Sequence, residues 1–262
     1  MLILLSPAKA LDFDAPVARA ALSDPRLLDQ AELLAAVMKT KTVAELARLS
    51  GVSDEIAALN AQRWADFAVP FPPGAARPAI LGFNGDAYQG MDARNRFSTA
   101  DFTEAQKTVR ILSGLYGVLR PLDAMLAYRL EMGTKLATER GKDLYQWWGD
   151  RISAVLAADL SASPGSATVI NLASQEYFTA VRPELLDGAV ISPRFEDTDA
   201  QGRRKVLSYY AKRARGEMAA WLVLNRERSP RKVVDFDVAG YRYDAASSTP
   251  AQPVFVRAFA DR

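Results

Sequence analysis

The sequence of 262 residues contains neither cysteine nor histidine. The first absence excludes disulfide bonds and a thiol nucleophile, and the second excludes an imidazole acid or base. Together they remove the side chains that most often bind zinc and other transition metals. No run of acidic residues has the spacing of a calcium-binding loop. Any chemistry must therefore use Asp, Glu, Lys, Tyr, Ser or backbone amides, and we expect neither a bound metal nor a cofactor.

Long hydrophobic runs are also lacking. The apolar run over residues 1–5 is too short for a signal peptide and has no basic residues before it. No stretch approaches the roughly 20 apolar residues that cross a bilayer. The formal net charge is only +2, which by itself indicates neither nucleic acid nor a membrane surface as a partner. We therefore expect a soluble, cytoplasmic protein without membrane association.

Hydrophobic residues make up 49% of the chain, so a sizeable core can be buried in one domain. Two segments rich in Pro, Gly or Ser, residues 69–74 and 161–166, are short enough to be surface loops. The sequence shows no internal repeat. We predict a single domain over residues 1–262.

Three short apolar segments have the pattern of buried strands, and they cover residues 1–5, 79–83 and 168–170. Each is followed by a polar loop, and these loops cover residues 6–9, 84–86 and 171–177. In open α/β sheets, ligands bind beyond the carboxyl ends of the strands. Every strand must end in some loop, but three polar loops favour a shared crevice.

Segments with helical periodicity separate the strands, over residues 25–38, 98–109, 143–156 and 211–225. A turn-rich segment, 197–202, lies between residues 190–195 and 205–209 and predicts an antiparallel hairpin. Residues 253–259 have the pattern of a closing strand. The predicted fold is an α/β domain whose mixed parallel and antiparallel sheet is flanked by helices.

The run from Ser113 to Asp123 is apolar but contains two glycines and ends in Arg-Pro-Leu-Asp. Gly114 and Gly117 would weaken a plain strand unless the backbone must bend or let another group approach closely. One interpretation is a bulged, buried strand that leads into a turn with an ion pair. The other is one wall of a ligand site, in which Arg120 binds an anion and Asp123 orients it or acts as a catalytic carboxylate.

Residues 42–66 predict two helices joined by a tight turn. Thr42 and Glu45 fit a capping box, Gly51 interrupts the helical pattern, and Ser53 can cap the second helix. This arrangement resembles the helix-hairpin-helix module, which holds nucleic-acid phosphates through backbone amides and a helix N-terminus. An ordinary pair of packed helices is the alternative.

Cations gather near the start of the helix predicted over residues 211–225. They are Arg203, Arg204, Lys205, Lys212, Arg213 and Arg215, and Tyr209 and Tyr210 lie between them. Cations beside aromatic rings suit a nucleic-acid groove, in which the cations contact phosphates and the rings contact bases. A solvated helix face is the alternative.

Carboxylates are the remaining candidates for acid–base chemistry. An extended segment places Arg129 and Glu131 on one face, and Asp86 and Asp123 belong to neighbouring motifs. If burial or a second carboxylate raises one pKa, Asp86, Asp123 or Glu131 can act as a general acid or base. An exposed ion pair is the alternative for Arg129 and Glu131.

Seven motifs follow one another along nearly the whole chain. They are Leu5–Lys9 with Leu11–Asp12, Gly85–Gly90, Ser113–Asp123, Tyr128–Gly133, Gly141–Asp150, Asn171–Phe178 and Tyr210–Gly216. Together they resemble the bacterial YaaA peroxide-stress protein family. The resemblance implies a cytosolic protein that helps cells survive hydrogen peroxide. It also implies that the protein limits free intracellular iron and so protects DNA and proteins from oxidative damage.

The resemblance further implies DNA binding through a positively charged cleft and the helix-hairpin-helix-like element. The residues that would bind DNA or another anion are Ser6, Lys9, Gly51, Ser53, Arg120, Arg129, Asn171, Ser174, Lys212 and Arg215. The expected partner is duplex or structured DNA, and the expected state is a monomer. The sequence departs from the family pattern at Ser53, where the hairpin usually has its second glycine, and at Asn84, where a lysine is usual.

Two other functions remain open. The first is an enzyme, similar to a glycosylase, that acts on a nucleobase, a nucleotide or a DNA lesion in the same cleft through Asp86, Asp123 or Glu131. The second is a protein-interaction factor that acts on iron or repair machinery. Because thiols and imidazoles are absent, peroxide sensing by a cysteine is excluded, and a fall in free iron is more easily an indirect effect than sequestration.

Overall fold

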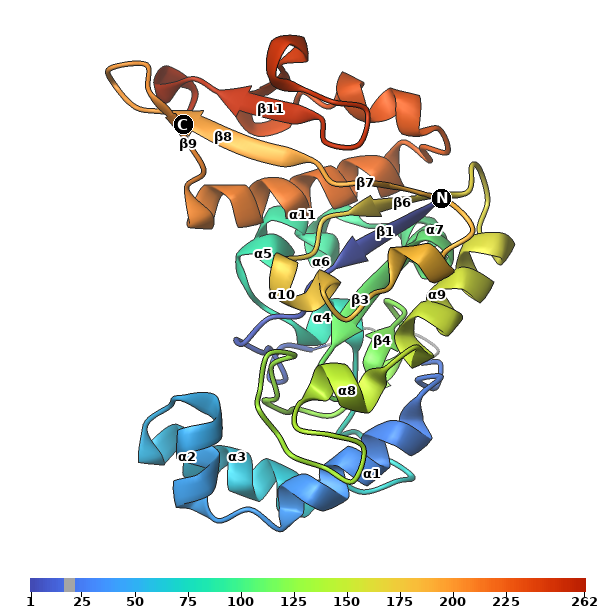
Figure 1. The fold of residues 1–262 in the computed structure, drawn as a ribbon, viewed down its shortest axis with the longest axis vertical. Coiled ribbons are helices and arrows are strands. Elements are labelled where there is room, and N and C mark those ends of the chain that lie inside the picture. The colour runs from blue at the N-terminus through green and yellow to red at the C-terminus, as the bar shows by residue number, and fades with distance from the viewer. Residues whose placement is uncertain (17–21) are drawn as a thin grey trace.

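A five-stranded mixed sheet forms the centre of the computed structural model, which describes residues 1–16 and 22–262 (Figure 1). The strand order is β4-β3-β1-β6-β7, and the strands are β1 (Leu2–Leu5), β3 (Val109–Ser113), β4 (Gly117–Leu119), β6 (Thr168–Asn171) and β7 (Ala189–Ile191). β1 pairs in parallel with β3 and β6, β6 pairs in parallel with β7, and β4 is antiparallel to β3. The predicted α/β class with a mixed sheet is therefore confirmed.

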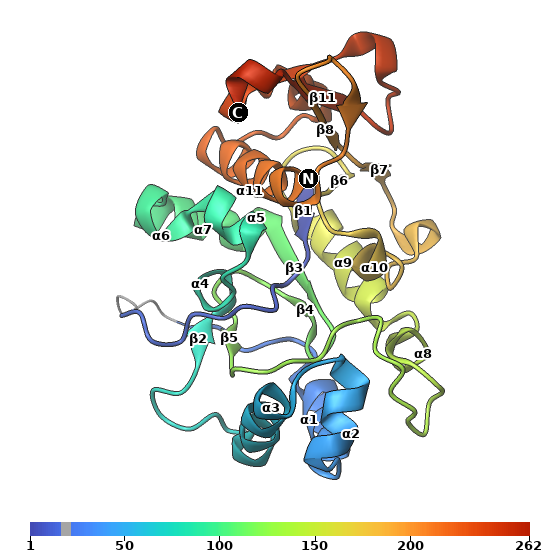
Figure 2. The ribbon, with the colours of Figure 1, turned by 90° about the vertical axis from the view of Figure 1, so that its left-hand side faces the viewer.

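Helices cover both faces of this sheet. All four residues of β1 are buried, as expected of an uninterrupted apolar strand between two helical layers. α7 (Thr99–Thr108) lies on one side and α9 (Arg151–Ala162) on the other (Figure 2). Ser98 and Asp101 form a capping box that starts α7. The pattern of a strand buried on both faces thus predicted the centre of the fold.

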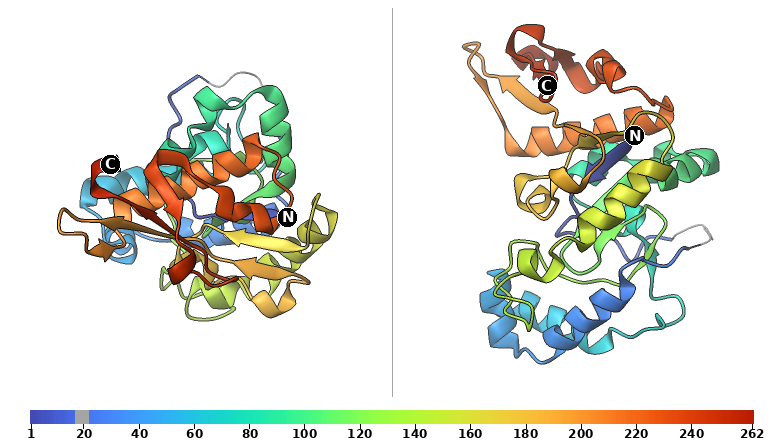
Figure 3. Two further views of the ribbon diagram at one scale, coloured as in Figure 1. Left: turned by 90° about the horizontal axis from the view of Figure 1, so that it is seen from above. Right: turned by 45° about the vertical axis from the view of Figure 1, so that its right-hand side comes forward.

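A second sheet lies beyond α11 (Ser208–Leu224), at the opposite end of the molecule from α1 (Leu28–Lys39), α2 (Val43–Ser50) and α3 (Asp54–Asp66) (Figures 1 and 3). Its order is β10-β11-β8-β9, and its strands are β8 (Arg194–Thr198), β9 (Arg204–Lys205), β10 (Tyr241–Tyr243) and β11 (Val254–Arg257). β8 and β9 form the predicted antiparallel hairpin. The expected strand over 205–209 is shorter, because α11 already begins at Ser208.

The remaining elements are short. They are β2 (Arg77–Pro78) paired with β5 (Ala124–Met125), α4 (Ala79–Gly82), α5 (Asp86–Met91), α6 (Ala93–Arg96), α8 (Leu144–Trp148), α10 (Gln175–Phe178), and 3₁₀ turns at Pro183–Leu185, Pro230–Asp235, Val238–Gly240, Ala245–Ser247 and Phe259–Asp261. Within the part of the chain that the structure describes, no helix is long and apolar enough to cross a membrane.

Two predicted elements are wrong. Residues 79–83 form the helical turn α4 instead of a strand, and the amide of Ala79 donates to the carbonyl oxygen of Asp123 at 3.0 Å. An apolar run of five residues does not distinguish a buried strand from a buried helical turn. The helix predicted over 143–156 is divided into α8 and α9 at Gly149, whose φ is +50°.

The run over residues 113–123 forms a tight hairpin instead of one bulged strand. β3 ends at Ser113 and β4 begins at Gly117, whose φ of +68° lies in the left-handed region that favours glycine. A Cβ atom at Gly114 would lie 2.2 Å from the carbonyl oxygen of Leu130. One glycine therefore permits the turn, and the other permits the close approach of a second backbone segment.

The helix pair predicted over 42–66 is present. Thr42 and Glu45 form the capping box of α2, and Gly51 ends that helix with a φ of +58°. The Oγ of Ser53 accepts a hydrogen bond from the amide three residues later, at the start of α3. That Gly51 and Ser53 bind phosphate stays a prediction.

We expect the substitution Gly114→Ala to lower the free energy of unfolding by about 1–3 kcal/mol, because the added methyl group collides with a backbone carbonyl. Urea unfolding of the purified protein measures the change. Gly82→Ala is the matched control, since a Cβ there meets its nearest neighbours at 3.4 and 3.5 Å. Equal stability of the two variants would contradict the assigned role of Gly114.

Candidate functional site

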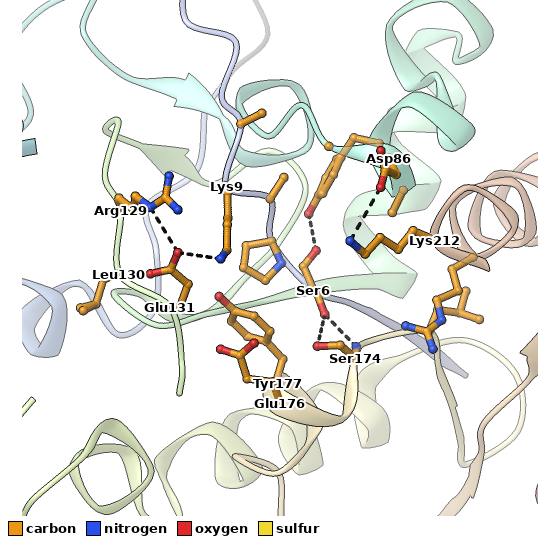
Figure 4. Close-up of a pocket in the computed structure, with 18 of the residues that line it drawn as sticks. Ser6, Lys9, Asp86, Arg129, Leu130, Glu131, Ser174, Glu176, Tyr177 and Lys212 are labelled. Carbon is orange, nitrogen blue, oxygen red and sulfur yellow. Dashed lines mark hydrogen bonds and ion pairs between the residues drawn. The ribbon is translucent and has the colours of Figure 1, made fainter. Parts of the chain in front are cut away.

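A pocket of about 500 Å³ lies where the loops after β1 and β6 leave the central sheet (Figure 4). Its lining comes from residues 6–10, 85–88 and 128–131, from the loop and helix over 172–177, and from α11. We call it the main pocket. The structure therefore brings together five of the seven motifs that the sequence selected.

A pair of serines fixes the base of the main pocket. The Oγ of Ser6, after β1, accepts a hydrogen bond from the amide of Ser174, after β6, at 2.8 Å. It also donates to the Oγ of Ser174 at 3.3 Å. The hydroxyl of Tyr88 donates to the carbonyl oxygen of Ser6 at 2.9 Å. These bonds hold two strand ends and α5 in one arrangement.

Two glycines let α5 and α11 touch backbone to backbone. A Cβ at Gly216 would lie 1.7 Å from the carbonyl oxygen of Ala87, and a Cβ at Gly90 would lie 2.2 Å from that of Arg213. No larger residue fits at either position without separating the helices. This contact places Lys212 and Arg215 of α11 in the lining of the pocket. Both glycines end sequence motifs, residues 85–90 and 210–216, but no local pattern indicates that they bring two helices together.

Charged groups lie on opposite sides of the main pocket (Figure 4). On one side, the Nζ of Lys9 lies 3.4 Å and the Nε of Arg129 lies 3.2 Å from Oε1 of Glu131. Neither the Nε of Arg129 nor this Oε1 makes a hydrogen bond with a described residue, although both atoms are buried. On the other side, the Nζ of Lys212 lies 3.7 Å from a carboxylate oxygen of Asp86.

Arg215 has no comparable partner. Its side chain lines the main pocket, but among residues 1–16 and 22–262 it makes no hydrogen bond and no ion pair. Burial lowers its pKa, yet a guanidinium remains protonated in proteins. The pocket therefore contains a partly buried positive charge without a counter-charge, and an anion would supply one.

Buried tyrosines supply rings and hydroxyls to the pocket. Tyr88, Tyr128 and Tyr177 are 6%, 5% and 7% exposed. Burial raises the pKa of each hydroxyl, so all three stay protonated at neutral pH. Tyr128 shares a hydrogen bond of 2.6 Å with the Oγ of Ser113. The rings thus form an apolar surface with fixed polar tips.

Glu176 was also missed by the sequence analysis. It lines the main pocket, and its Oε1 accepts a hydrogen bond from the amide of Gly133 at 2.9 Å. Its backbone carbonyl accepts another from the hydroxyl of Tyr145 at 3.0 Å. The only sequence signal was its place two residues after Ser174, in the same polar loop.

A second hollow of about 580 Å³ lies between α2 and residues 133–137. It is lined by Lys41, Arg48 and Lys135, none of which makes an ion pair with a described residue, and by Glu45. Residues 128–131 line the main pocket and residues 133–137 line this second hollow, so one continuous segment joins them.

The helix pair and the main pocket also influence each other electrostatically. Burial, followed by the positive charge of Arg129, lowers the pKa of Arg63 on α3. Gly51 and Ser53, in the turn before α3, line neither hollow. Within the described residues, side chains of the helix pair therefore lie beside residues 128–137. The turn between the two helices does not line either hollow.

Arg120 and Asp123 lie outside the main pocket. Asp123 is 1% exposed and accepts hydrogen bonds from the backbone amide of Arg120 at 2.8 Å, from its Nε at 2.9 Å and from Ser23 Oγ at 2.6 Å. Arg120 donates in turn to the carbonyl oxygen of Asp24 at 3.1 Å. The pair closes the turn after β4, and its role in ligand binding stays a prediction.

Asn171 and the cations before α11 have structural partners too. Asn171 accepts a hydrogen bond from the amide of Ala173 at 3.0 Å, which shapes the loop after β6. Arg203 pairs with Asp199 at 2.8 Å, and Arg204 pairs with Asp244 at 2.6 Å. Of the predicted basic cluster, only Lys212 and Arg215 line the main pocket. Among the residues described, no group of three or more acidic side chains is placed to hold a metal ion.

Comparison with protein families matches residues 1–247 to the family described as peroxide stress protein YaaA. A UPF0246 protein of Alcanivorax borkumensis is 48% identical over 257 residues, which covers 98% of each chain. UPF0246 proteins of Burkholderia lata and Burkholderia vietnamiensis are each 48% identical over 258 residues, again 98% of both chains. The family resemblance of the sequence motifs is thereby confirmed.

We expect Arg215→Met to leave the free energy of unfolding unchanged or to raise it by about 1 kcal/mol, because it removes a partly buried charge that has no partner. The matched control is Arg110→Met. Arg110 is 5% exposed and its Nε lies 2.5 Å from Asp159, so its loss should cost about 3 kcal/mol. Urea unfolding in a buffer without phosphate or sulfate measures both. Equal destabilisation would mean that Arg215 is a structural residue.

Proposed function

Because this chain belongs to the peroxide stress protein YaaA family, we propose that it acts in the cytosol by binding DNA. In this proposal, bound DNA is protected during peroxide stress, and the fall in free iron and in damage to DNA and proteins follows indirectly. The observation that carries the proposal is the pair of cation-lined hollows joined by residues 128–137.

The distribution of charge supports this proposal. The main pocket is lined by Lys9, Arg129, Lys212 and Arg215, and the second hollow by Lys41, Arg48 and Lys135. The carboxylates of both linings are Asp86, Glu131, Glu176 and Glu45. The two linings thus carry three more cations than carboxylates, whereas the whole chain has a net charge of only +2. Positive charge is concentrated where a phosphate backbone would lie.

The contribution of the helix pair is assigned to its side chains. The N-terminus of α3 begins with Asp54 and Glu55, and these carboxylates would repel a phosphate at that end. Lys41 and Arg48, by contrast, line the second hollow together with Lys135. We propose that these three cations contact the DNA backbone, with Gly51 and Ser53 setting the angle between α2 and α3.

The salt dependence of DNA binding tests the proposal. Each phosphate contact contributes about −0.9 to the slope of log K against log salt concentration. We expect the double variant Lys212→Ala and Arg215→Ala to reduce the steepness of that slope by about 2. Lys107→Ala is the control, since this exposed cation of α7 lines neither hollow. Absence of DNA binding at low salt, or an equal effect of the control, would reject the proposal.

An enzyme that acts on a nucleobase, a nucleotide or a DNA lesion is the second candidate. It is favoured by the position of Asp86 and Glu131 in the lining of the main pocket; the third candidate, Asp123, lies outside that lining. Incubation with DNA that contains damaged bases and with a panel of nucleotides tests it. Turnover that is lost in Glu131→Gln would support it, and binding without turnover would reject it.

The methionines fit a protein that works in the presence of peroxide. All six are at most 1% exposed: Met1, Met38, Met91, Met125, Met132 and Met218. Cysteine is absent, so the two side chains that hydrogen peroxide oxidises most readily are either missing or shielded.

We therefore expect folded protein treated with hydrogen peroxide to keep its mass and its affinity for DNA. The same protein in urea should gain up to six oxygen atoms as methionine sulfoxide. Intact-mass spectrometry measures both states. Rapid oxidation of the folded protein would contradict the shielding.

A further inference from the structure

We propose that the main pocket receives a single unstacked nucleotide of a DNA strand that lies along the cleft. Its phosphate contacts Arg215 and Lys212, and its base lies against Tyr88 and Tyr177 within reach of Glu131. This inference rests on the proposed binding of DNA and adds to it the unit that enters the protein.

The size of the main pocket fits a single nucleotide and excludes a duplex. A volume of about 500 Å³ lies within the range of about 300–1,000 Å³ that small-molecule pockets occupy. A duplex is too wide to enter such a pocket and stays at its rim. One nucleotide fits, provided that its base has left the stack.

The phosphate site is built on one face of α11. Lys212 and Arg215 are three residues apart and therefore neighbours on the helix surface. The glycine contact with α5 holds this helix segment against residues 85–88. The guanidinium of Arg215 has no partner among the described residues, and its planar fork suits bidentate contact with a phosphate. A bound phosphate would neutralise the one cation of the pocket that the described residues leave uncompensated.

The base site lies on the other side. Leu130, Leu172 and the buried tyrosines provide apolar surface for the faces of a base. Oε1 of Glu131 lies beside Lys9 and Arg129, and neither carboxylate oxygen of Glu131 accepts a hydrogen bond from a described residue. A carboxylate oxygen accepts hydrogen bonds from the amino group of a base, as in contacts of Glu with cytosine. The pocket therefore favours a base with an exocyclic amino group over thymine.

Continuity of the cationic surface identifies the source of the nucleotide. A free mononucleotide would use the main pocket alone. The segment 128–137, however, leads from that pocket to Lys41, Arg48 and Lys135 in the second hollow. These cations suit the flanking phosphates of a strand whose unstacked nucleotide occupies the pocket.

Three DNA duplexes of equal length test the proposal with the full-length protein. One is fully paired, one contains a single bulged cytosine, and one contains an abasic nucleotide at the bulged position. We expect the bulged cytosine to bind about tenfold more tightly than the paired duplex, because its base is already unstacked. The abasic bulge should bind no more tightly than the paired duplex, since it bends the DNA without offering a base.

Variants assign the preference to the pocket. A fourth duplex carries a bulged thymine in place of the cytosine, and Glu131→Gln should bring the preference for bulged cytosine over bulged thymine close to one. Arg215→Met should remove the preference for the bulge, whereas the control Lys107→Met should retain it. Because Arg215→Met is expected to be stably folded, its loss of preference would not reflect unfolding.

The outcomes separate this inference from the proposed function. Equal binding of all three duplexes would overturn the nucleotide site and leave DNA binding intact, and failure to bind any duplex would overturn both. Tight binding of the abasic bulge would overturn the base site, because flexibility alone would then explain the preference. In a further outcome, a deoxynucleoside monophosphate raises the melting temperature of the protein while the protein shows no preference for the bulged duplex. That result would contradict a DNA strand as the source of the bound nucleotide and would indicate a free mononucleotide instead.

Discussion

The parallel pairing of β1 with both β3 and β6 is the interaction on which the rest of the structure depends. Residues 2–5 are buried, and the amino group of Met1 donates to the carbonyl oxygen of Pro164 at 2.7 Å, which fixes the start of the central strand. Because β1 and β6 run in the same direction, their polar loops leave the same edge of the sheet. Ser6 and Ser174 can therefore meet. An antiparallel β6 would have placed Ser174 at the opposite edge, and the main pocket would not exist.

The contact of α5 with α11 adds the cationic side of that pocket at a cost in stability. Gly90 and Gly216 bring the two helices close enough to set Lys212 and Arg215 beside the loop after β1. Elsewhere, buried guanidinium groups are compensated, as Arg110 is by Asp159. No described residue compensates Arg215, and an uncompensated charge is destabilising unless a ligand neutralises it. Such a local conflict is expected at a functional site and not in a scaffold.

The sequence predicted those features whose causes lie within a few residues. Uninterrupted apolar residues identified β1, and the spacing of Thr42 and Glu45 identified the capping box of α2. Predictions were incomplete or wrong where the cause lies elsewhere in the chain. A close approach was an expected reason for Gly114, but no local pattern shows that Leu130 is the residue that approaches it. The same limit applies to the helical turn over residues 79–83.

Site residues show this limit most clearly. Arg120 and Arg215 both occur in motifs that resemble the family, and both are among the residues expected to bind an anion. The structure separates them by their partners, since Arg120 binds Asp123 whereas Arg215 has none among the described residues. Partner choice depends on tertiary packing, so composition and spacing select candidate cations but do not say which of them remain available for a ligand.

The absence of cysteine and the burial of every methionine limit how this chain can act under peroxide stress. A side chain that peroxide does not reach cannot report on peroxide, so a response must come from the amount of protein or from what it binds. Anion binding suits that role, because a ligand that binds only the folded state stabilises it. The gain is about 2.7 kcal/mol when the free ligand concentration is 100 times the dissociation constant. In the proposed complex an anion neutralises the charge of Arg215, so that the stability which this charge costs the free protein would be regained on binding.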